Sequence, residues 1–187
     1  MKYKLIITGL FSICFTLLSS GQDTLQVVLK SYDSSVYKYH NYIITTTRKH
    51  TETGDNIQIF SIAKNRNLKF EDAGDEYFYF VYKDFAIFDV GTCASIRGFY
   101  VYNFDEEKYI YNHNNYGGDV SQEDDKLYFE TPISDSIIHA EKLKLPVCKD
   151  CLKGNDNMSC GYVRKIYYDL RLRKEVNTKK IRCAFFE

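Results

Sequence analysis

The chain has 187 residues, of which 44% are hydrophobic and 27% are charged, so its composition is that of a globular protein and excludes wholesale disorder. Its 25 basic residues balance 25 acidic ones, which removes the basic surface expected of a nucleic-acid-binding protein. The 17 tyrosines and 13 phenylalanines, with no tryptophan, favour β-strands over helices.

The N-terminus has the three parts of a secretory signal peptide. Lys2 and Lys4 precede an apolar stretch at 5–18, and small residues follow it up to Gly21. The stretch is shorter than the ~20 residues that a transmembrane helix requires. We therefore expect residues 1–21 to be a cleaved signal peptide and not a membrane anchor.

Cleavage would leave residues 22–187 as the mature chain. Cys14 is not preceded by the small residues that a lipid-attachment site needs, and no second apolar stretch reaches membrane length. The leader contains two of the basic residues and no acidic one, so the mature chain is slightly acidic. We expect an extracytoplasmic protein, periplasmic or secreted, without a transmembrane segment.

Short segments with strand character follow one another along the mature chain, separated by clusters of Gly, Asn and Asp that favour turns. They are 25–29, 36–47, 57–63, 68–70, 77–90, 99–104, 109–111, 127–129, 137–145, 162–172 and 181–186. This spacing predicts one all-β domain, a single antiparallel β-sandwich or a barrel-like fold, over residues 22–187.

Within this pattern, Lys83-Asp84 predicts a two-residue hairpin turn in the apolar segment 77–90. A short helix competes with a strand at 137–145, where Ser136 could cap it. The segments 112–126 and 146–161 are expected to be irregular, and a loop as long as the first is often functional.

Two stretches share a pattern at an offset of 66 residues: Tyr102-Asn103-Phe104 with Lys108, and Tyr168-Asp169-Leu170 with Lys174. Each is predicted to be a hairpin of strand, polar turn and strand. Such hairpins recur in propeller blades, and residues 77–113 fit a four-stranded meander, but two copies do not make an array of blades. We attribute the match to chance and to ordinary hairpin chemistry.

Five cysteines remain after the leader, and in an oxidising compartment they predict disulfides: Cys93, Cys148, Cys151, Cys160 and Cys183. We expect one of Cys148 or Cys151 to pair with Cys160, and the other to pair with Cys183 or Cys93. The odd cysteine is free, pairs with another chain or carries an adduct.

Two sharper readings of these cysteines compete with disulfides. Cys148 and Cys151 have the close spacing of a zinc-binding pair, and Cys160 with Cys183 would complete four thiolates. Export disfavours this reading, and the turn-forming residues 154–157 disfavour the helix that a redox-active pair requires. We expect no metal site and no cofactor.

No catalytic motif is present, so we expect a protein without catalytic activity. The alternative is a hydrolase whose site is assembled from distant residues, with Asp89, Cys93 or His113 as candidates. His113 itself, beside three asparagines, is expected in a loop. The acidic residues 105–107 are expected in a hairpin turn, and 123–125 in an acidic loop or, alternatively, a calcium site.

The preferred interpretation is a binding module for an envelope protein or a cell-envelope glycan. Tyrosines that alternate along strands share a face and offer a large, rigid contact area. The predicted binding residues, from such a row and from the segment 112–126, are Tyr100, Tyr102, Asn114, Tyr116 and Asp119. Ordinary cross-strand pairing is the alternative role for the tyrosines. A third possibility is an assembly component that adds an edge strand to a neighbour.

Overall fold

The structure is a computed structural model that describes residues 25–50, 52–71, 74–93, 96–148 and 159–186. The described part contains twelve strands and one short helix, and every strand pair is antiparallel. The all-β prediction is therefore confirmed, while the expected signal peptide lies outside the described residues.

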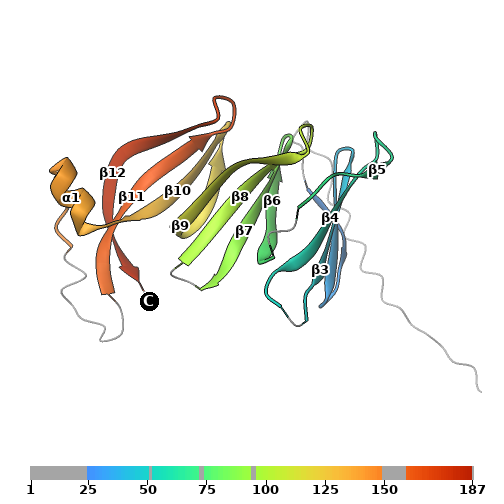
Figure 1. The fold of residues 1–187 in the computed structure, drawn as a ribbon, viewed down its shortest axis with the longest axis horizontal. Coiled ribbons are helices and arrows are strands. Elements are labelled where there is room, and N and C mark those ends of the chain that lie inside the picture. Colours follow the sequence, from blue (N-terminus) through green and yellow to red (C-terminus); the bar gives the residue numbers. More distant parts are fainter. Residues whose placement is uncertain (1–24, 51, 72–73, 94–95, 149–158, 187) are drawn as a thin grey trace, which may run out of the picture.

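The strands form three layers that follow one another along the chain (Figure 1). Sheet A consists of β1 (Gln26–Lys30), β2 (Ser34–Tyr39), β3 (Tyr42–Arg48), β4 (Asp55–Ser61) and β5 (Arg66–Asn67). Sheet B consists of β6 (Glu76–Tyr82), β7 (Phe85–Cys93), β8 (Ile96–Asn103) and the first part of β9 (Lys108–Glu123). Sheet C consists of the second part of β9 with β10 (Lys126–Ile133), β11 (Ser159–Asp169) and β12 (Lys174–Phe186).

Strand β9 belongs to two sheets because its pairing partner changes along its length. Its first part pairs with β8 as far as Tyr116, and its second part pairs with β10 from Gly117 onward. The expected irregular loop at 112–126 is therefore wrong. Its polar residues and its two adjacent glycines are compatible with a strand because this part of the sheet is bulged and largely exposed.

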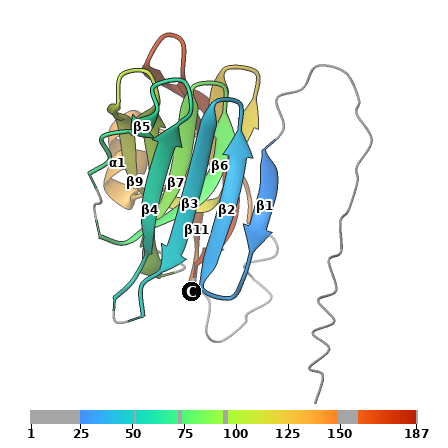
Figure 2. The ribbon, with the colours of Figure 1, turned by 90° about the vertical axis from the view of Figure 1, so that its right-hand side faces the viewer.

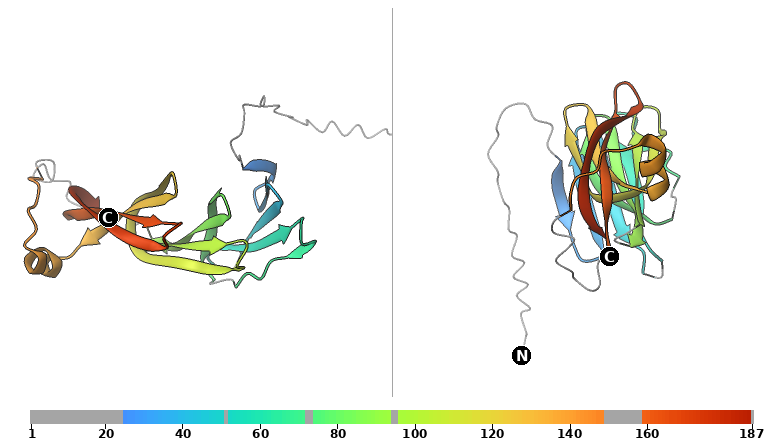
Figure 3. Two further views of the ribbon diagram at one scale, coloured as in Figure 1. Left: turned by 90° about the horizontal axis from the view of Figure 1, so that it is seen from above. Right: turned by 90° about the vertical axis from the view of Figure 1, so that its left-hand side faces the viewer.

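Sheet B is buried on both faces, since it lies between the other two sheets (Figure 3). Along β7, Ala86 and Phe88 face sheet A, whereas Ile87 faces sheet C, as the two-residue period of a strand dictates. This explains why the segment 77–90 is apolar nearly throughout. The Lys83-Asp84 turn that interrupts it is confirmed.

Each sheet contains the same pair of turns. A two-residue turn with positive φ at its first residue joins strands at His40-Asn41, Lys83-Asp84 and Asp124-Asp125. A four-residue turn with positive φ at its last residue follows at 62–65, 104–107 and 170–173. A backbone bond connects the two turns in every case: Ile62 N donates to Asn41 O at 2.7 Å, Phe104 N to Asp84 O at 2.9 Å and Leu170 N to Asp125 O at 2.8 Å.

The hairpins predicted at 102–108 and 168–174 are confirmed, and both stretches form this four-residue turn in equivalent places. The offset of 66 residues conceals the repeat. Between β10 and β11 the third sheet has an extra segment, residues 134–158, which the other two sheets lack.

The sequence predicts one strand over the segment 36–47, but the turn at His40-Asn41 divides it into β2 and β3.

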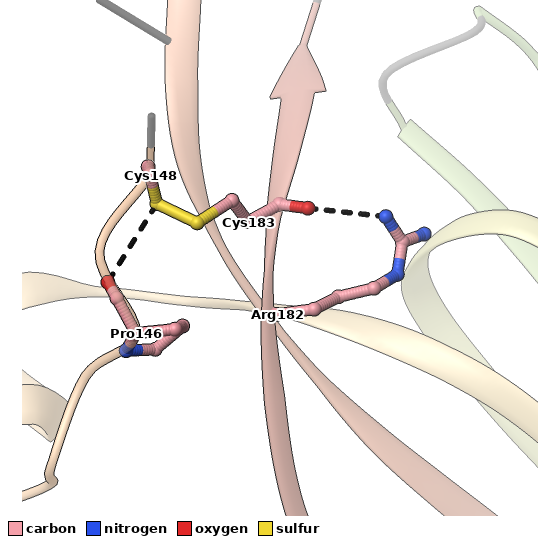
Figure 4. Close-up of a disulfide and its surroundings, with 4 residues drawn as sticks. All are labelled: Pro146, Cys148, Arg182 and Cys183. Atoms are coloured by element: carbon pink, nitrogen blue, oxygen red, sulfur yellow. Dashed lines mark hydrogen bonds between the residues drawn. A yellow bond between two sulfur atoms is a disulfide. The ribbon is translucent and has the colours of Figure 1, made fainter. Parts of the chain in front are cut away.

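The extra segment begins with α1 (Asp135–Glu141), which confirms the competing helix at 137–145 in part. The N-cap is Ser134 and not Ser136, and the helix buries none of its residues. The segment is tied to β12 by a disulfide between Cys148 and Cys183 (Figure 4). Around this disulfide, Arg182 donates a hydrogen bond to the Cys183 carbonyl oxygen at 3.1 Å.

The predicted disulfide framework is thus supported, with Cys183 as the partner of Cys148. Cys160, at the start of β11, is also disulfide-bonded. Cys151 lies outside the described residues, and the side chain of Cys93 lies outside them as well.

Charged pairs connect the turns of neighbouring sheets. Glu107 accepts hydrogen bonds from Lys64 at 2.8 Å and from Arg66 at 2.5 Å, which joins sheets A and B. Asp125 accepts one from Lys83 at 2.5 Å, and Glu106 pairs with Arg173, which joins sheets B and C. The acidic residues 105–107 therefore lie in a hairpin turn as expected, and the carboxylate of Asp125 is engaged by cations.

Candidate functional site

A polar cavity of about 650 Å³ lies at the end of sheet A opposite the His40-Asn41 turn. Three parts of sheet A surround it: the turn between β1 and β2, the ends of β2 and β3, and the segment between β3 and β4. One residue of sheet B, on β6, completes it. Its lining comprises residues 31–35, Tyr37, Thr46, 48–50, 52–55 and Tyr77.

The turn between β1 and β2 is fixed by a serine pair. Ser31 N donates to Ser34 O at 2.8 Å, and Ser34 N donates to Ser31 Oγ at 3.0 Å. The neighbouring strand is held to this turn by Arg48 N, which donates to Asp33 O at 2.8 Å. Hydroxyl and carbonyl groups of this side of the cavity therefore have defined positions.

The opposite side of the cavity is held against sheet B. Gly54 N donates to the Tyr77 hydroxyl at 3.0 Å, and Lys49 Nζ donates to the Gly74 carbonyl oxygen at 2.9 Å. Both contacts join residues far apart in sequence. They keep the segment between β3 and β4 close to β6.

Gly54 is required where this segment meets sheet B. Its φ of +88° lies in the left-handed region, and a Cβ there would be 2.8 Å from Asp75 Cα. Any larger residue would therefore force the segment away from β6.

Aromatic rings and charges of both signs line the cavity. Its tyrosines are Tyr32, Tyr37 and Tyr77, and the Arg48 guanidinium lies over the Tyr32 ring at 5.4 Å. The remaining ionisable lining residues are Asp33, Lys49, His50, Glu52 and Asp55. Such a mixture suits a polar ligand that has both an apolar ring face and hydrogen-bonding groups.

Asp55 is the half-buried carboxylate of this group. It lies opposite Arg48 in the β3–β4 register. Burial raises the pKa of its carboxyl, and the nearby Arg48 and Lys49 charges oppose that effect. A neutral or positively charged ligand group that donates a hydrogen bond would satisfy the Asp55 carboxylate.

The predicted binding residues do not lie at this cavity. Tyr102 is 1% exposed, in the core between sheets A and B, and its hydroxyl donates to the Lys69 carbonyl oxygen at 2.5 Å. Tyr100 is half-buried beside the same core, where its ring packs against Tyr109 at 5.3 Å. Tyr100 and Tyr102 share a face as expected, but that face is turned toward sheet A.

The other three predicted binding residues lie along β9. Asn114 and Asp119 are exposed, and Tyr116 pairs through its backbone with Arg97, while its side chain lies outside the described part. Burial and the nearby carboxylate of Asp119 raise the pKa of Tyr79 on β6. Binding by these residues stays a prediction.

Two of the candidates for catalysis, Asp89 and His113, lie on either side of Phe99 in the register of β7, β8 and β9. Asp89 forms an ion pair with Arg97 of β8. His113 lies in β9 and not in a loop, so the expectation of a loop is wrong. Its Nε2 is 3.0 Å from Thr131 Oγ1, and its Nδ1 is 3.4 Å from Glu175 Oε2. Burial lowers the pKa of this imidazole.

No residue of the cavity was predicted as a binding residue from the sequence. The available signal was the polar run from Ser31 to Ser35 and the basic run from Arg48 to His50, each at a strand end. Only the fold shows that these two runs meet and that Tyr77 joins them.

Comparison with protein families, with curated proteins and with solved structures finds no match for this chain. In the described residues, no three His, Cys, Asp or Glu side chains are grouped so that they could hold a metal ion. None of the described helices is long and apolar enough to cross a membrane.

Proposed function

We propose that the protein is an exported, non-catalytic binding module that holds part of a cell-envelope glycan in the cavity of sheet A. The observation that carries this proposal is the cavity itself, a preformed hollow of about 650 Å³ with three tyrosines and a polar lining. Sugar rings have apolar faces that pack on aromatic rings, and their hydroxyls bond to carboxylates and hydroxyls.

The residues of the cavity provide both kinds of contact. Tyr32 is 83% exposed, so its ring is accessible to a ligand. Asp33 and Asp55 offer carboxylate oxygens, and the serines of the β1–β2 turn offer hydroxyls. Because the hydrogen bonds described above fix the cavity wall, little conformational entropy of the protein would be lost on binding.

Export is supported by the N-terminal leader pattern and by the Cys148–Cys183 disulfide. Disulfides persist in oxidising compartments and are rare in the cytosol. An envelope glycan is therefore a ligand that the protein would meet.

Co-sedimentation with insoluble polysaccharides tests this function. The purified mature protein is mixed with peptidoglycan sacculi, chitin or cellulose, and the fraction retained is measured. We expect retention on at least one of them and about tenfold weaker binding by Tyr32→Ala, the loss that removing one stacked ring would cause.

The matched control is Tyr128→Ala, which removes a half-buried tyrosine of sheet C that does not line the cavity. It is expected to bind like the wild type. Absence of retention on all three polysaccharides, or equal binding by the wild type and Tyr32→Ala, would contradict the proposal. Retention of a protein partner and of no polysaccharide would replace the glycan with a protein ligand.

A hydrolytic function has one set of contacts in its favour. Thr131, His113 and Glu175 follow the hydroxyl–imidazole–carboxylate order of a hydrolytic triad. We place this function second because the Tyr111 hydroxyl also donates to Glu175 Oε2, at 2.5 Å, and so competes with the imidazole for the same oxygen. Equal rates of p-nitrophenyl acetate hydrolysis by the wild type and Thr131→Val would exclude it.

A further inference from the structure

Strand β1 forms one edge of sheet A, where β2 is its only neighbour among the described strands (Figure 2). All five of its residues are exposed. Val27, Val28 and Leu29 are 58%, 62% and 54% exposed, although each is apolar. A strand edge of this kind offers unpaired backbone groups together with an apolar surface.

The edge formed by β12, at the other end of the molecule, is protected by charged side chains. Its sequence contains Lys174, Lys179 and Lys180, and Arg182 forms an ion pair with Glu130 of β10. Charged side chains on an edge strand hinder pairing with another chain. In β1 the only charged residue is Lys30, at its end, so no charged side chain protects its centre.

A bulge lies at the centre of β1. The register with β2 shifts between Val27 and Leu29, which leaves Val28 without a Cα partner on β2. The sequence of β1 is nearly symmetric about Val28, with one apolar neighbour on each side and a polar residue beyond each of them.

We propose that β1 pairs with β1 of a second copy of this chain, antiparallel and centred on Val28. A closed two-fold dimer requires identical strands to pair in this antiparallel way. Val27 of one copy then lies opposite Leu29 of the other, and Lys30 lies opposite Gln26. The only charge of the strand faces a neutral hydrogen-bonding side chain, so no like charges oppose each other.

The size of the contact sets the strength of the association. A pair of five-residue strands is small compared with the interfaces of stable complexes, and interfaces below about 1,200 Å² are typical of weak, transient complexes. The dimer is therefore expected to dissociate at low protein concentration and to form from about 10 μM to about 1 mM.

Sedimentation equilibrium of the mature protein over that concentration range tests the dimer. The wild type is expected to shift from monomer to dimer. Val28→Lys and Val28→Glu are each expected to remain monomeric, because two like charges would meet at the two-fold axis. An equimolar mixture of the two variants is expected to form a heterodimer, because opposite charges then face each other.

Leu172→Lys is the matched control, since Leu172 is 70% exposed in the turn between β11 and β12, away from this edge. It is expected to dimerise like the wild type. Amide hydrogen exchange provides a second measurement, in which the N–H groups of β1 become slower to exchange as the protein concentration rises. This second measurement is made on the wild type and so does not depend on how a variant folds.

A wild type that stays monomeric throughout the range would overturn the proposal, as would dimers of either Val28 variant alone. Failure of the mixed variants to associate would contradict the register centred on Val28. The proposal does not depend on the ligand of the cavity, so it can fail while glycan binding holds.

Discussion

Asn103 and Asp169 occupy the same position in two turns that lie 66 residues apart in the sequence. Asn103 Oδ1 accepts hydrogen bonds from the backbone N–H groups of Asp105 and Glu106, at 2.9 and 2.8 Å. Asp169 Oδ1 accepts them in the same way from Arg171 and Leu172, at 3.0 and 2.8 Å. One side-chain oxygen thus satisfies two backbone donors that the four-residue turn leaves without a strand partner.

Removing that oxygen is expected to destabilise the fold. Asn103→Ala should lower the free energy of unfolding by about 1–2 kcal/mol, because Asn103 is 6% exposed and two backbone N–H donors lose their acceptor. Asn103→Asp should stay much closer to the wild type, since the acceptor oxygen is retained. Urea unfolding followed by circular dichroism measures the free energy of unfolding of both variants. Equal losses by the two variants would show that the acceptor oxygen does not account for the stabilisation.

A second prediction concerns the wall of the cavity. Gly54→Ala is expected to lower the free energy of unfolding by about 1–3 kcal/mol, because it combines a strained positive φ with a clash against the backbone of Asp75. Gly74→Ala is the control: its φ is +105°, but a Cβ there would meet nothing within 4 Å. Thermal unfolding should rank Gly54→Ala as the more damaging of the two, and the opposite ranking would contradict the close approach to β6.

The Cys148–Cys183 disulfide closes a loop with a sequence separation of 35. Replacing both cysteines by serine is expected to lower the free energy of unfolding by about 3–4 kcal/mol, the loop-closure value for a loop of this size. Peptide mapping by mass spectrometry under non-reducing conditions checks the pairing first. A peptide in which Cys148 is joined to a different cysteine would refute it.

His113 predicts a pH dependence of stability. Burial holds the pKa of its imidazole below the unfolded value, so the unfolded chain takes up the proton first as the pH falls. The stabilisation is complete above a pH of about 6.5 and is lost as the pH falls below it toward the folded pKa.

Chemical unfolding at several pH values between about 7 and about 5 measures this effect. The wild type should lose more stability over this window than His113→Gln, which has no titrating imidazole in the core. His139→Gln, an exposed position on α1, serves as the control and should keep the wild-type slope. A slope unchanged by His113→Gln would contradict the assignment.

Local sequence patterns were sufficient to locate the strands that are buried. The alternation and the turn residues located β6, β7 and β8, because the two faces of sheet B are filled by apolar side chains that only a strand can direct both ways. They were insufficient to locate the second half of β9, which is largely polar and exposed and contains Gly117. An exposed strand without an apolar face has the composition of a loop, and only its pairing with β10 identifies it.

The cavity could not be derived from local patterns for a different reason. Tyr77 and Gly54 are 23 positions apart, and their contact exists only because sheet A packs on sheet B. The tyrosines at positions 100 and 102 were correctly placed on one face, but the alternation does not say which sheet covers that face. Stacking order is a property of the whole chain, and no window of the sequence contains it.

Because β9 is shared, sheets B and C have no connecting segment between them and are joined by one continuous strand. Sheet A, in contrast, is joined to its neighbour by a connection between β5 and β6. A cut in the backbone at that connection would leave every described strand intact, whereas a cut between sheets B and C would divide β9.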